Sequence, residues 1–326
     1  MRILVTGGAG YIGSHVVADL LELEHPVLVL DDLQRGNPQN AVVFQEHPAY
    51  RLIQAAIDDD AALRLVQDWQ PEICFHFAAL KAAGESMQRP DLYSSHNVRA
   101  SYRLIEALLR IGCNRIIFSS TAAVYGEPRY VPIDEEHPLQ PVNYYGFSKL
   151  AIEQNLEWMT RLTNLRYVAL RYFNAAGYDL QGRIKGLERE PQNLFPILME
   201  AACGQRATVQ VLGTDYDTPD GSGVRDYIHV NDLADAHVRA MQYLSDGGAS
   251  TVVNLGSESG LSVFEAITAV EVASGAKIDW QTAPRRAGDP ARVIASSNKA
   301  RQLLDWTPSY SQADRIAASM WPLYQQ

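Results

Sequence analysis

The sequence has little of what marks several protein classes. Only three cysteines occur in 326 residues, Cys74, Cys113 and Cys203, and their odd number and wide spacing exclude a disulfide framework and a CxxC metal site. No run approaches 18 apolar residues, so we expect no membrane span. The first segment turns to glycine too early for a signal peptide. We therefore expect a cytoplasmic protein that contacts no membrane.

Positive charge is also scarce. Lys and Arg total 28 against 38 Asp and Glu, which gives a net charge of −10. Such an acidic balance argues against a nucleic-acid partner, and any anionic ligand must be held by local Arg, Lys and backbone N–H groups. His15, His76 and His229 have no partner at metal-ligand spacing, so we expect no metal site. The remaining composition, 47% hydrophobic and 20% charged, is that of a globular chain.

Short β-branched runs alternate with amphipathic segments through the first half of the chain. Continuous apolar runs between helices predict a parallel sheet that is buried on both faces. Right-handed crossovers then give a doubly wound, Rossmann-like α/β fold. The expected strands are 2–6, 27–31, 51–54, 73–77, 115–120 and 166–171, and the expected helices are 11–23, 61–69, 92–111 and 145–162.

The pattern changes near residue 174. Two long polar loops, 178–193 and 213–225, precede helices near 231–244 and 262–273, and loops of this length in a compact domain are usually functional. We predict a Rossmann-like domain over 1–173 and a smaller mixed α/β domain over 174–326. The segment from about 226 to 255 is expected to return to the first domain. Ligands of open α/β sheets bind at the carboxyl ends of the strands.

A glycine loop follows the first strand. It contains Gly7, Gly10 and Gly13 and opens a helix, while Asp31 ends the second strand. Glycine lets the backbone approach a pyrophosphate, and the helix N-terminus offers it N–H groups. An acidic side chain after the second strand accepts hydrogen bonds from the hydroxyls of an adenosine ribose and repels a 2′-phosphate. These features predict a dinucleotide site that takes NAD. A tight turn without a ligand is the alternative, and Arg35 leaves NADP open.

A tyrosine and a lysine stand four residues apart on one helix. Tyr145 and Lys149 share a face, and the strand 115–120 leads into Ser119 and Thr121 at the expected ligand edge. A nearby ammonium and a bound nicotinamide cation favour the phenolate, so Tyr145 is the candidate base. Thr121 could share the proton. Packing of Tyr145 at the domain boundary and capping by Thr121 are the structural alternatives.

Eight segments then occur in one order: MRILVTGGAGYIGSH, HFAALKA-GES, FSSTAAVYGE, YYGFSK, RYFNAAG, GSGVRDYIHVNDLADAH, NLG and APRRAGDPA. In this set the chain resembles the UDP-glucose 4-epimerases of the extended short-chain dehydrogenase/reductase family. The resemblance runs from residue 1 to about 305. It implies an isomerase that inverts C4 of a UDP-hexose through a transient 4-keto sugar, with NAD tightly bound.

The resemblance also assigns residues. It implies Tyr145, Lys149 and Thr121 as catalytic. For the cofactor it implies Gly7, Gly10, Tyr11, Ile12, Gly13, Asp31, Ile57, Phe77, Ala78, Lys81, Asn97, Ser119, Tyr145, Lys149 and Tyr172. For the substrate it implies Lys81, Thr121, Tyr145, Asn174, Asn193, Leu194, Arg225, Tyr227, Arg286, Asp289 and Val293. Independently, the guanidinium groups of Arg225 and Arg286 suit a pyrophosphate; surface lysine and surface ion-pair roles are the alternatives for Lys81 and these arginines.

Two positions depart from the family pattern. Ala56 stands where many members carry an aspartate that contacts adenine; either the register differs or Asp58 substitutes. Val293 lies at a position that lines the hexose pocket, and its small side chain leaves room for an N-acetyl group. UDP-N-acetylgalactosamine is therefore a second candidate substrate.

Several other readings stay open. The chain could epimerise another UDP-sugar, such as a pentose or a uronic acid. A sugar-nucleotide dehydratase is disfavoured, because Ala122 and Ala123 follow Thr121 where dehydratases carry Asp-Glu. A non-catalytic NAD-sensing protein would need the glycine loop but not the hydroxyl, the tyrosine and the lysine together. By the resemblance, helices 92–111 and 145–162 would pair two copies into a homodimer.

Overall fold

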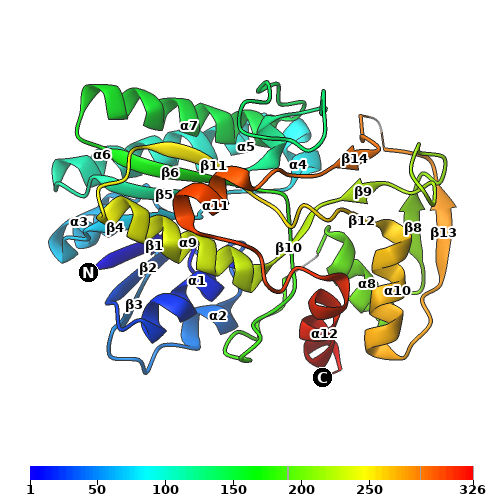
Figure 1. Ribbon diagram of the computed structural model, residues 1–326. Helices are drawn as coiled ribbons and strands as arrows, with labels where there is room; N and C mark the ends of the chain where they lie inside the picture. Colours follow the sequence, from blue (N-terminus) through cyan, green and yellow to red (C-terminus); the bar gives the residue numbers. More distant parts are fainter. Residues whose placement is uncertain (189–190, 287, 326) are drawn as a thin grey trace.

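A seven-stranded sheet forms the centre of the computed structural model, which describes residues 1–188, 191–286 and 288–325 (Figure 1). The strand order is β11-β6-β5-β4-β1-β2-β3, and every pair is parallel. Strands that cross over on both sides of β1 make the sheet doubly wound. The bounds are β1 (Ile3–Thr6), β2 (Val27–Asp31), β3 (Tyr50–Gln54), β4 (Ile73–His76), β5 (Arg115–Thr121), β6 (Arg166–Tyr172) and β11 (Thr251–Leu255).

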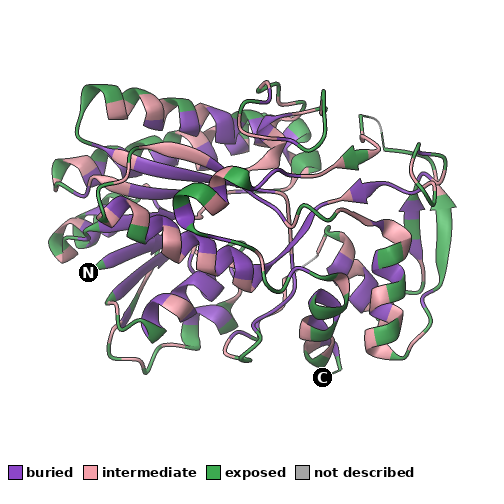
Figure 2. Ribbon diagram, viewed as in Figure 1, coloured by how far each residue is buried: buried purple, intermediate pink, exposed green. Residues whose placement is uncertain are grey.

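Helices cover both faces of this sheet. Helices α1 (Tyr11–Glu22) and α9 (Val230–Ser245) pack on one face, where Val5 and Leu20 belong to one apolar cluster. Helices α3 (Asp60–Trp69), α6 (Ala100–Arg110) and α7 (Tyr144–Leu162) pack on the other, where Leu4 and Leu104 belong to a second cluster. Figure 2 shows the inner strands of the sheet buried, and β1, β2 and β4 are buried at every residue. The expected fold class is confirmed, because side chains of each strand alternate between two apolar layers.

The helix expected over 92–111 differs in detail. It is divided into α5 (Pro90–Tyr93), a π-helical segment η1 (Ser94–Arg99) and α6, while α4 (Ala83–Gln88) precedes it. Within η1, the buried amide of Asn97 bonds the backbone of Leu80 through both its oxygen and its nitrogen, at 2.9 and 3.0 Å. The wider turn accompanies this tertiary contact, of which the periodicity of the sequence carries no sign.

The rest of the chain builds smaller sheets around a separate apolar cluster. Helices α8 (Leu194–Ala202), α10 (Val263–Ser274) and α12 (Ala313–Tyr324) stand beside the strands β8 (Val209–Leu212) and β13 (Trp280–Ala283), which pair with each other (Figure 1). Strand β9 (Val224–Arg225) lies between β12 (Leu261–Ser262) and β14 (Arg292–Val293), and β10 (Tyr227–His229) pairs with β7 (Asn174–Ala176). The remaining short elements are α2 (Pro38–Val42), η2 (Ala122–Val124) and α11 (Asn298–Leu304).

The chain passes back to the large sheet after β10. Helix α9 packs against α1, and β11 pairs with β6 at the edge of the sheet. Nothing among the helices of the described residues is both long and apolar enough to cross a membrane.

Candidate active site

The glycine loop after β1 is shaped by steric necessity. Gly7 has φ +72°, and a Cβ there would lie 2.6 Å from the backbone nitrogen of Ala78. A Cβ on Gly13 would lie 2.3 Å from the carbonyl oxygen of Gly7. Gly10 is the N-cap of α1 and no side chain caps this helix, so its first N–H groups remain available to an anion. Only glycine permits this close approach of backbone segments.

Asp31 stands beside that loop at the end of β2. Its side chain is buried, and its carboxylate accepts from the backbone N–H of Ala9 and of Leu33, each at 2.9 Å. Burial raises the pKa of Asp31, while these two hydrogen bonds oppose the rise. The carboxylate is thus held rigidly, with lone pairs left for a ribose hydroxyl.

The two residues that open α1 have separate surroundings. The Tyr11 hydroxyl donates to the carbonyl of Gly177 at 2.5 Å, which ties the helix to the loop after β7. Ile12 packs against the apolar cluster of the sheet.

The segment after β4 carries three predicted cofactor residues, and a fourth, in η1, holds this segment. Ala78 donates to the Thr6 carbonyl at 3.2 Å, which holds this segment next to the glycine loop. Phe77 packs against the ring of His237, with centroids 4.8 Å apart. Lys81 is exposed and forms an ion pair with Glu188 in the long loop. Asn97 uses its amide to hold Leu80, so its role is to shape this segment.

The segment after β3 carries Ala56, where many family members have an aspartate that contacts adenine, and its two following residues are both engaged within the protein. Ile57 is buried in the second apolar cluster. Asp58, the candidate substitute for the missing adenine-contacting acid, pairs with Arg99 at 3.1 Å and is thereby engaged within the protein.

Tyr145, Lys149 and Thr121 meet at the carboxyl end of β5. Asn143 caps α7 by accepting from Gly146 N–H at 2.8 Å, which fixes the first turn that carries Tyr145. The Thr121 side chain lies close enough to the Tyr145 hydroxyl to oppose the rise that burial causes in the pKa of that tyrosine. The Lys149 ammonium is buried and donates to the Ser119 carbonyl at 2.7 Å. The sequence-predicted trio is therefore brought together.

Burial dominates the electrostatics of this group. It raises the pKa of Tyr145 to about 12, and the neighbouring Thr121 side chain opposes the rise. It lowers the pKa of Lys149 to about 7, and the negative charge of Glu153 opposes the fall. The protein's own groups favour a neutral phenol, so the lowering expected from the sequence depends on the positive ring of a nicotinamide.

Two further hydroxyls border this group. Ser119 and Tyr172 are hydrogen-bonded through their side-chain oxygens. Burial raises the pKa of Tyr172, so it stays a neutral donor. Both were predicted to face the cofactor, and both lie at the ends of neighbouring strands, β5 and β6.

Sequence reasoning missed a buried ion pair beneath Lys149. Glu153 and Arg171 are each 4% exposed, and Arg171 donates to Glu153 through Nε at 2.9 Å and Nη2 at 2.5 Å. Glu153 also accepts from the Ser120 hydroxyl. Its position four residues after Lys149, on the same face of α7, was a usable signal.

Four of the predicted substrate residues, Asn174, Arg225, Tyr227 and Val293, lie on the strands β7, β9, β10 and β14. Arg225 pairs with Asp289 at 2.5 Å, and Val293 lies in register with Arg225. Asn174 donates to the carbonyl of Asp226 at 2.9 Å. Tyr227 is buried against Phe195. Val293 packs with the cluster that contains Tyr125 and Leu150, so it borders the segment that follows Thr121.

Three of the predicted substrate residues make fewer side-chain contacts. Arg286 is exposed, Asn193 is the N-cap of α8 without a side-chain cap, and Leu194 opens that helix. The neighbouring Arg285 was not among the predicted residues. Its Nε forms an ion pair with Asp215 Oδ1 at 2.7 Å, and its Cζ lies 4.1 Å from the centroid of the Tyr216 ring. The adjacent arginines in APRRAGDPA were the available signal.

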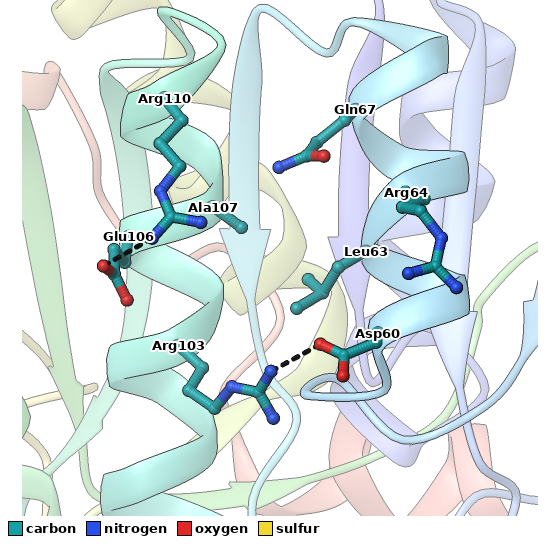
Figure 3. Close-up of a pocket in the computed structure, with 8 residues that line it drawn as sticks. All are labelled: Asp60, Leu63, Arg64, Gln67, Arg103, Glu106, Ala107 and Arg110. Carbon is teal, nitrogen blue, oxygen red and sulfur yellow. Dashed lines mark hydrogen bonds and ion pairs between the residues drawn. The ribbon is translucent and has the colours of Figure 1, made fainter.

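A groove of about 270 Å³ between α3 and α6 is a separate feature (Figure 3). Two of its three arginines, Arg103 and Arg110, pair with Asp60 and Glu106 respectively, and no predicted site residue lines it. It carries no part of the site. Across ranges 1–188, 191–286 and 288–325, no group of three or more His, Cys, Asp or Glu side chains is placed to hold a metal.

Comparisons with known proteins show the family to which the chain belongs. Residues 3–256 match the NAD dependent epimerase/dehydratase family. A UDP-glucose 4-epimerase of Streptococcus mutans is 43% identical over 98% of this chain and 96% of its own length. The UDP-glucose 4-epimerase of Halalkalibacterium halodurans is 44% identical over 100% of this chain and 96% of its own length. The chain belongs to the UDP-glucose 4-epimerases of this family. The resemblance, the isomerase class and the dependence on NAD that the sequence predicted are confirmed.

Solved epimerase structures agree with the fold along the whole chain. An epimerase from Stenotrophomonas maltophila with bound NAD and formylated UDP-arabinopyranose superposes with a TM-score of 0.95, at 37% identity and 99% and 98% coverage of the two chains. An epimerase from Bifidobacterium longum in complex with NAD⁺ and UDP superposes with a TM-score of 0.92, at 38% identity and 100% and 98% coverage.

Proposed function

We propose that the chain interconverts UDP-glucose and UDP-galactose by inverting C4 with a tightly bound NAD. One observation carries the proposal: Tyr145, Thr121 and the buried Lys149 lie together at the carboxyl end of β5. This edge of the sheet also holds the glycine loop and Asp31, where a doubly wound fold binds its dinucleotide.

The residues fit NAD. The free N–H groups at the start of α1 suit its pyrophosphate, and the Asp31 carboxylate suits the adenosine ribose and repels a 2′-phosphate. Gly7, Gly13, Phe77 and the other residues predicted from the resemblance form the walls of the site. When bound, NAD accepts a hydride from C4 of the sugar and returns it to the opposite face.

The protein's own groups move the proton. As the phenolate, Tyr145 Oη takes the proton of the 4-hydroxyl beside Thr121, and returns it after the flat 4-keto sugar has turned over. The Lys149 ammonium donates to Ser119 O and keeps two further N–H groups for the cofactor and for the phenolate charge. With Ala122 and Ala123 after Thr121, no acid is present there to eliminate water.

The diphosphate needs cations, and this acidic chain supplies one from β9 and one from the loop between β13 and β14. Arg225 faces Asp289 at 2.5 Å, and a bound diphosphate would offer its guanidinium stronger acceptors. Arg286 supplies a second cation. Asn174, Asn193, Leu194 and Tyr227 complete the proposed nucleotide contacts, and Lys81 reaches the site from the segment after β4.

The direct test is proton NMR of UDP-galactose with the purified protein, with and without added NAD. We expect the anomeric signal of UDP-glucose to grow without net reduction of the cofactor. Dependence on added NAD would indicate a cofactor site weakened at Ala56. Absence of UDP-glucose in both samples would refute the proposal and direct the same assay to UDP-pentoses and UDP-uronic acids.

A second substrate is favoured by Val293. Its small side chain lies in the cluster with Ala122 and Phe173, next to the catalytic group, and leaves space for an N-acetyl substituent. A solved relative from Campylobacter jejuni, 37% identical with a TM-score of 0.88, is described as a UDP-Glc/GlcNAc 4-epimerase. We propose that UDP-N-acetylgalactosamine is also converted. Turnover of UDP-galactose without turnover of this substrate would contradict it.

We also propose that two copies pair through α6 and α7. A groove of about 680 Å³ on this face is lined by Val98, Tyr102, Phe147 and Met159 and edged by charged Arg103 and Glu106. Phe147 is 48% and Tyr102 37% exposed, and both rings line this one groove; a contiguous exposed apolar patch marks an interaction surface. Light scattering should give a dimer, and Phe147→Glu should give a monomer; a monomeric parent would refute this.

With all three cysteines as free thiols, a reducing cytoplasm is the proposed setting.

A further inference from the structure

Asp226 lies where one strand changes partners. Before it, Arg225 of β9 pairs in register with Val293 of β14; after it, Tyr227 of β10 pairs in register with Asn174 of β7. The Asp226 N–H donates to the Val293 carbonyl at 3.0 Å, and its carbonyl accepts from the Asn174 backbone at 3.1 Å. The residue is thus flanked on both sides by proposed substrate residues.

The Asp226 carboxylate is fully buried and surrounded by donors. One oxygen accepts from the backbone N–H and the hydroxyl of Ser257, each at 2.7 Å. The other accepts from the N–H of Glu258 at 3.0 Å and of Ala295 at 3.1 Å. Four donors and no acceptor face the group, so only an ionised carboxylate satisfies them all.

These contacts join two parts of the molecule. Ser257 and Glu258 follow β11, which belongs to the large sheet, and Ala295 follows β14 in the smaller one. A Cβ on Gly256 would lie 2.5 Å from the Asp226 carboxylate, so the chain after β11 has to be glycine there. These hydrogen bonds fix the strands that carry Arg225, Tyr227 and Val293 to the large sheet, whose strand β5 ends at Thr121.

We propose that Asp226 is a positioning residue for the UDP-sugar: its carboxylate holds the substrate strands at a fixed place relative to the catalytic edge of the large sheet. It touches neither substrate nor cofactor by its side chain and acts through Arg225, Tyr227, Asn174 and Val293. The inference rests on the proposed function, which assigns these four residues to the substrate.

The test replaces the carboxylate by an amide. In Asp226→Asn, the amide NH2 faces two of the four donors, so about two hydrogen bonds are lost. We expect the Kd for UDP, measured by titration calorimetry, to rise about tenfold. KM for UDP-galactose should rise in parallel, while the NAD content of the purified protein stays unchanged. Ser257→Ala removes one donor only and should raise the Kd about threefold.

Asp232 provides a matched control six residues away. It is also a buried aspartate that accepts from two backbone N–H groups, of Ser309 and Tyr310, and one hydroxyl, of Ser311. It stands at the start of α9 and contacts no substrate strand through its side chain. Asp232→Asn should lower the melting temperature as Asp226→Asn does and leave the Kd for UDP unchanged.

The outcomes separate the two proposals. A parent protein that neither binds UDP nor converts UDP-galactose refutes the proposed function. A parent that does both, with an unchanged Kd in Asp226→Asn or an equal rise in Asp232→Asn, overturns the positioning role alone. If Asp226→Asn does not fold, Ser257→Ala decides, and an unchanged Kd in that variant overturns the role.

Discussion

Replacing Glu153 by glutamine should destabilise the protein severely while leaving its surface unchanged. The carboxylate receives two hydrogen bonds from the Arg171 guanidinium and one from the Ser120 hydroxyl, and both charged side chains are 4% exposed. Removing one partner leaves a buried guanidinium without a counter-charge. Breaking a buried pair in this way costs about 3–5 kcal/mol of the free energy of unfolding.

Urea denaturation of parent and variant, followed by circular dichroism, measures this loss. The matched control is Glu157→Gln on the same helix, because Glu157 pairs with Arg161 while the two side chains are 46% and 58% exposed. An exposed pair with this spacing contributes about 0.3–0.5 kcal/mol, and an amide can still accept from the Tyr167 hydroxyl that contacts Glu157 at 3.1 Å.

A double variant tests the cause of the loss. Glu153→Met with Arg171→Met removes both charges together, and replacing a buried pair by apolar residues is often neutral or stabilising. We expect it to recover about 2 kcal/mol or more of the loss. Equal effects of Glu153→Gln and Glu157→Gln, or a double variant weaker than Glu153→Gln, would refute the reasoning from desolvation.

Three other predictions concern the site. Tyr145→Phe removes the proton acceptor and should lower kcat about 10²–10⁴-fold with unchanged NAD content and melting temperature; parental turnover would exclude Tyr145 as the base. In NAD-free protein, burial lowers the folded pKa of Lys149 to about 7 from 10.5, so the unfolded chain holds the extra proton between these values. This residue therefore makes stability increase with pH from about 7 to 10.5, and thermal melts of Lys149→Met should lack that increase relative to the parent. Val293→Phe should abolish conversion of UDP-N-acetylgalactosamine and retain that of UDP-galactose; equal loss of both in an NMR assay would contradict a pocket-size role.

Local chemistry was enough to predict part of this molecule. The glycine loop, Asp31 and the pair Tyr145 and Lys149 lie in the expected turn, strand and helix because each of these depends on neighbours in the chain: a turn needs glycine, and positions four apart share a helix face. The alternation of apolar strands and helices predicted the doubly wound sheet for the same reason.

Only the tertiary structure decided the rest. The π-helical turn at Asn97, the ion pair of Lys81 with Glu188 and the buried pair of Glu153 with Arg171 join segments that are far apart in sequence. Asp226 reads locally as one acid between Arg225 and Tyr227; its four donors come from residues 257, 258 and 295. Burial and the partners of a buried charge are properties of the packed chain, so the sequence determines which groups are present, and packing determines which of them are charged, held and brought together.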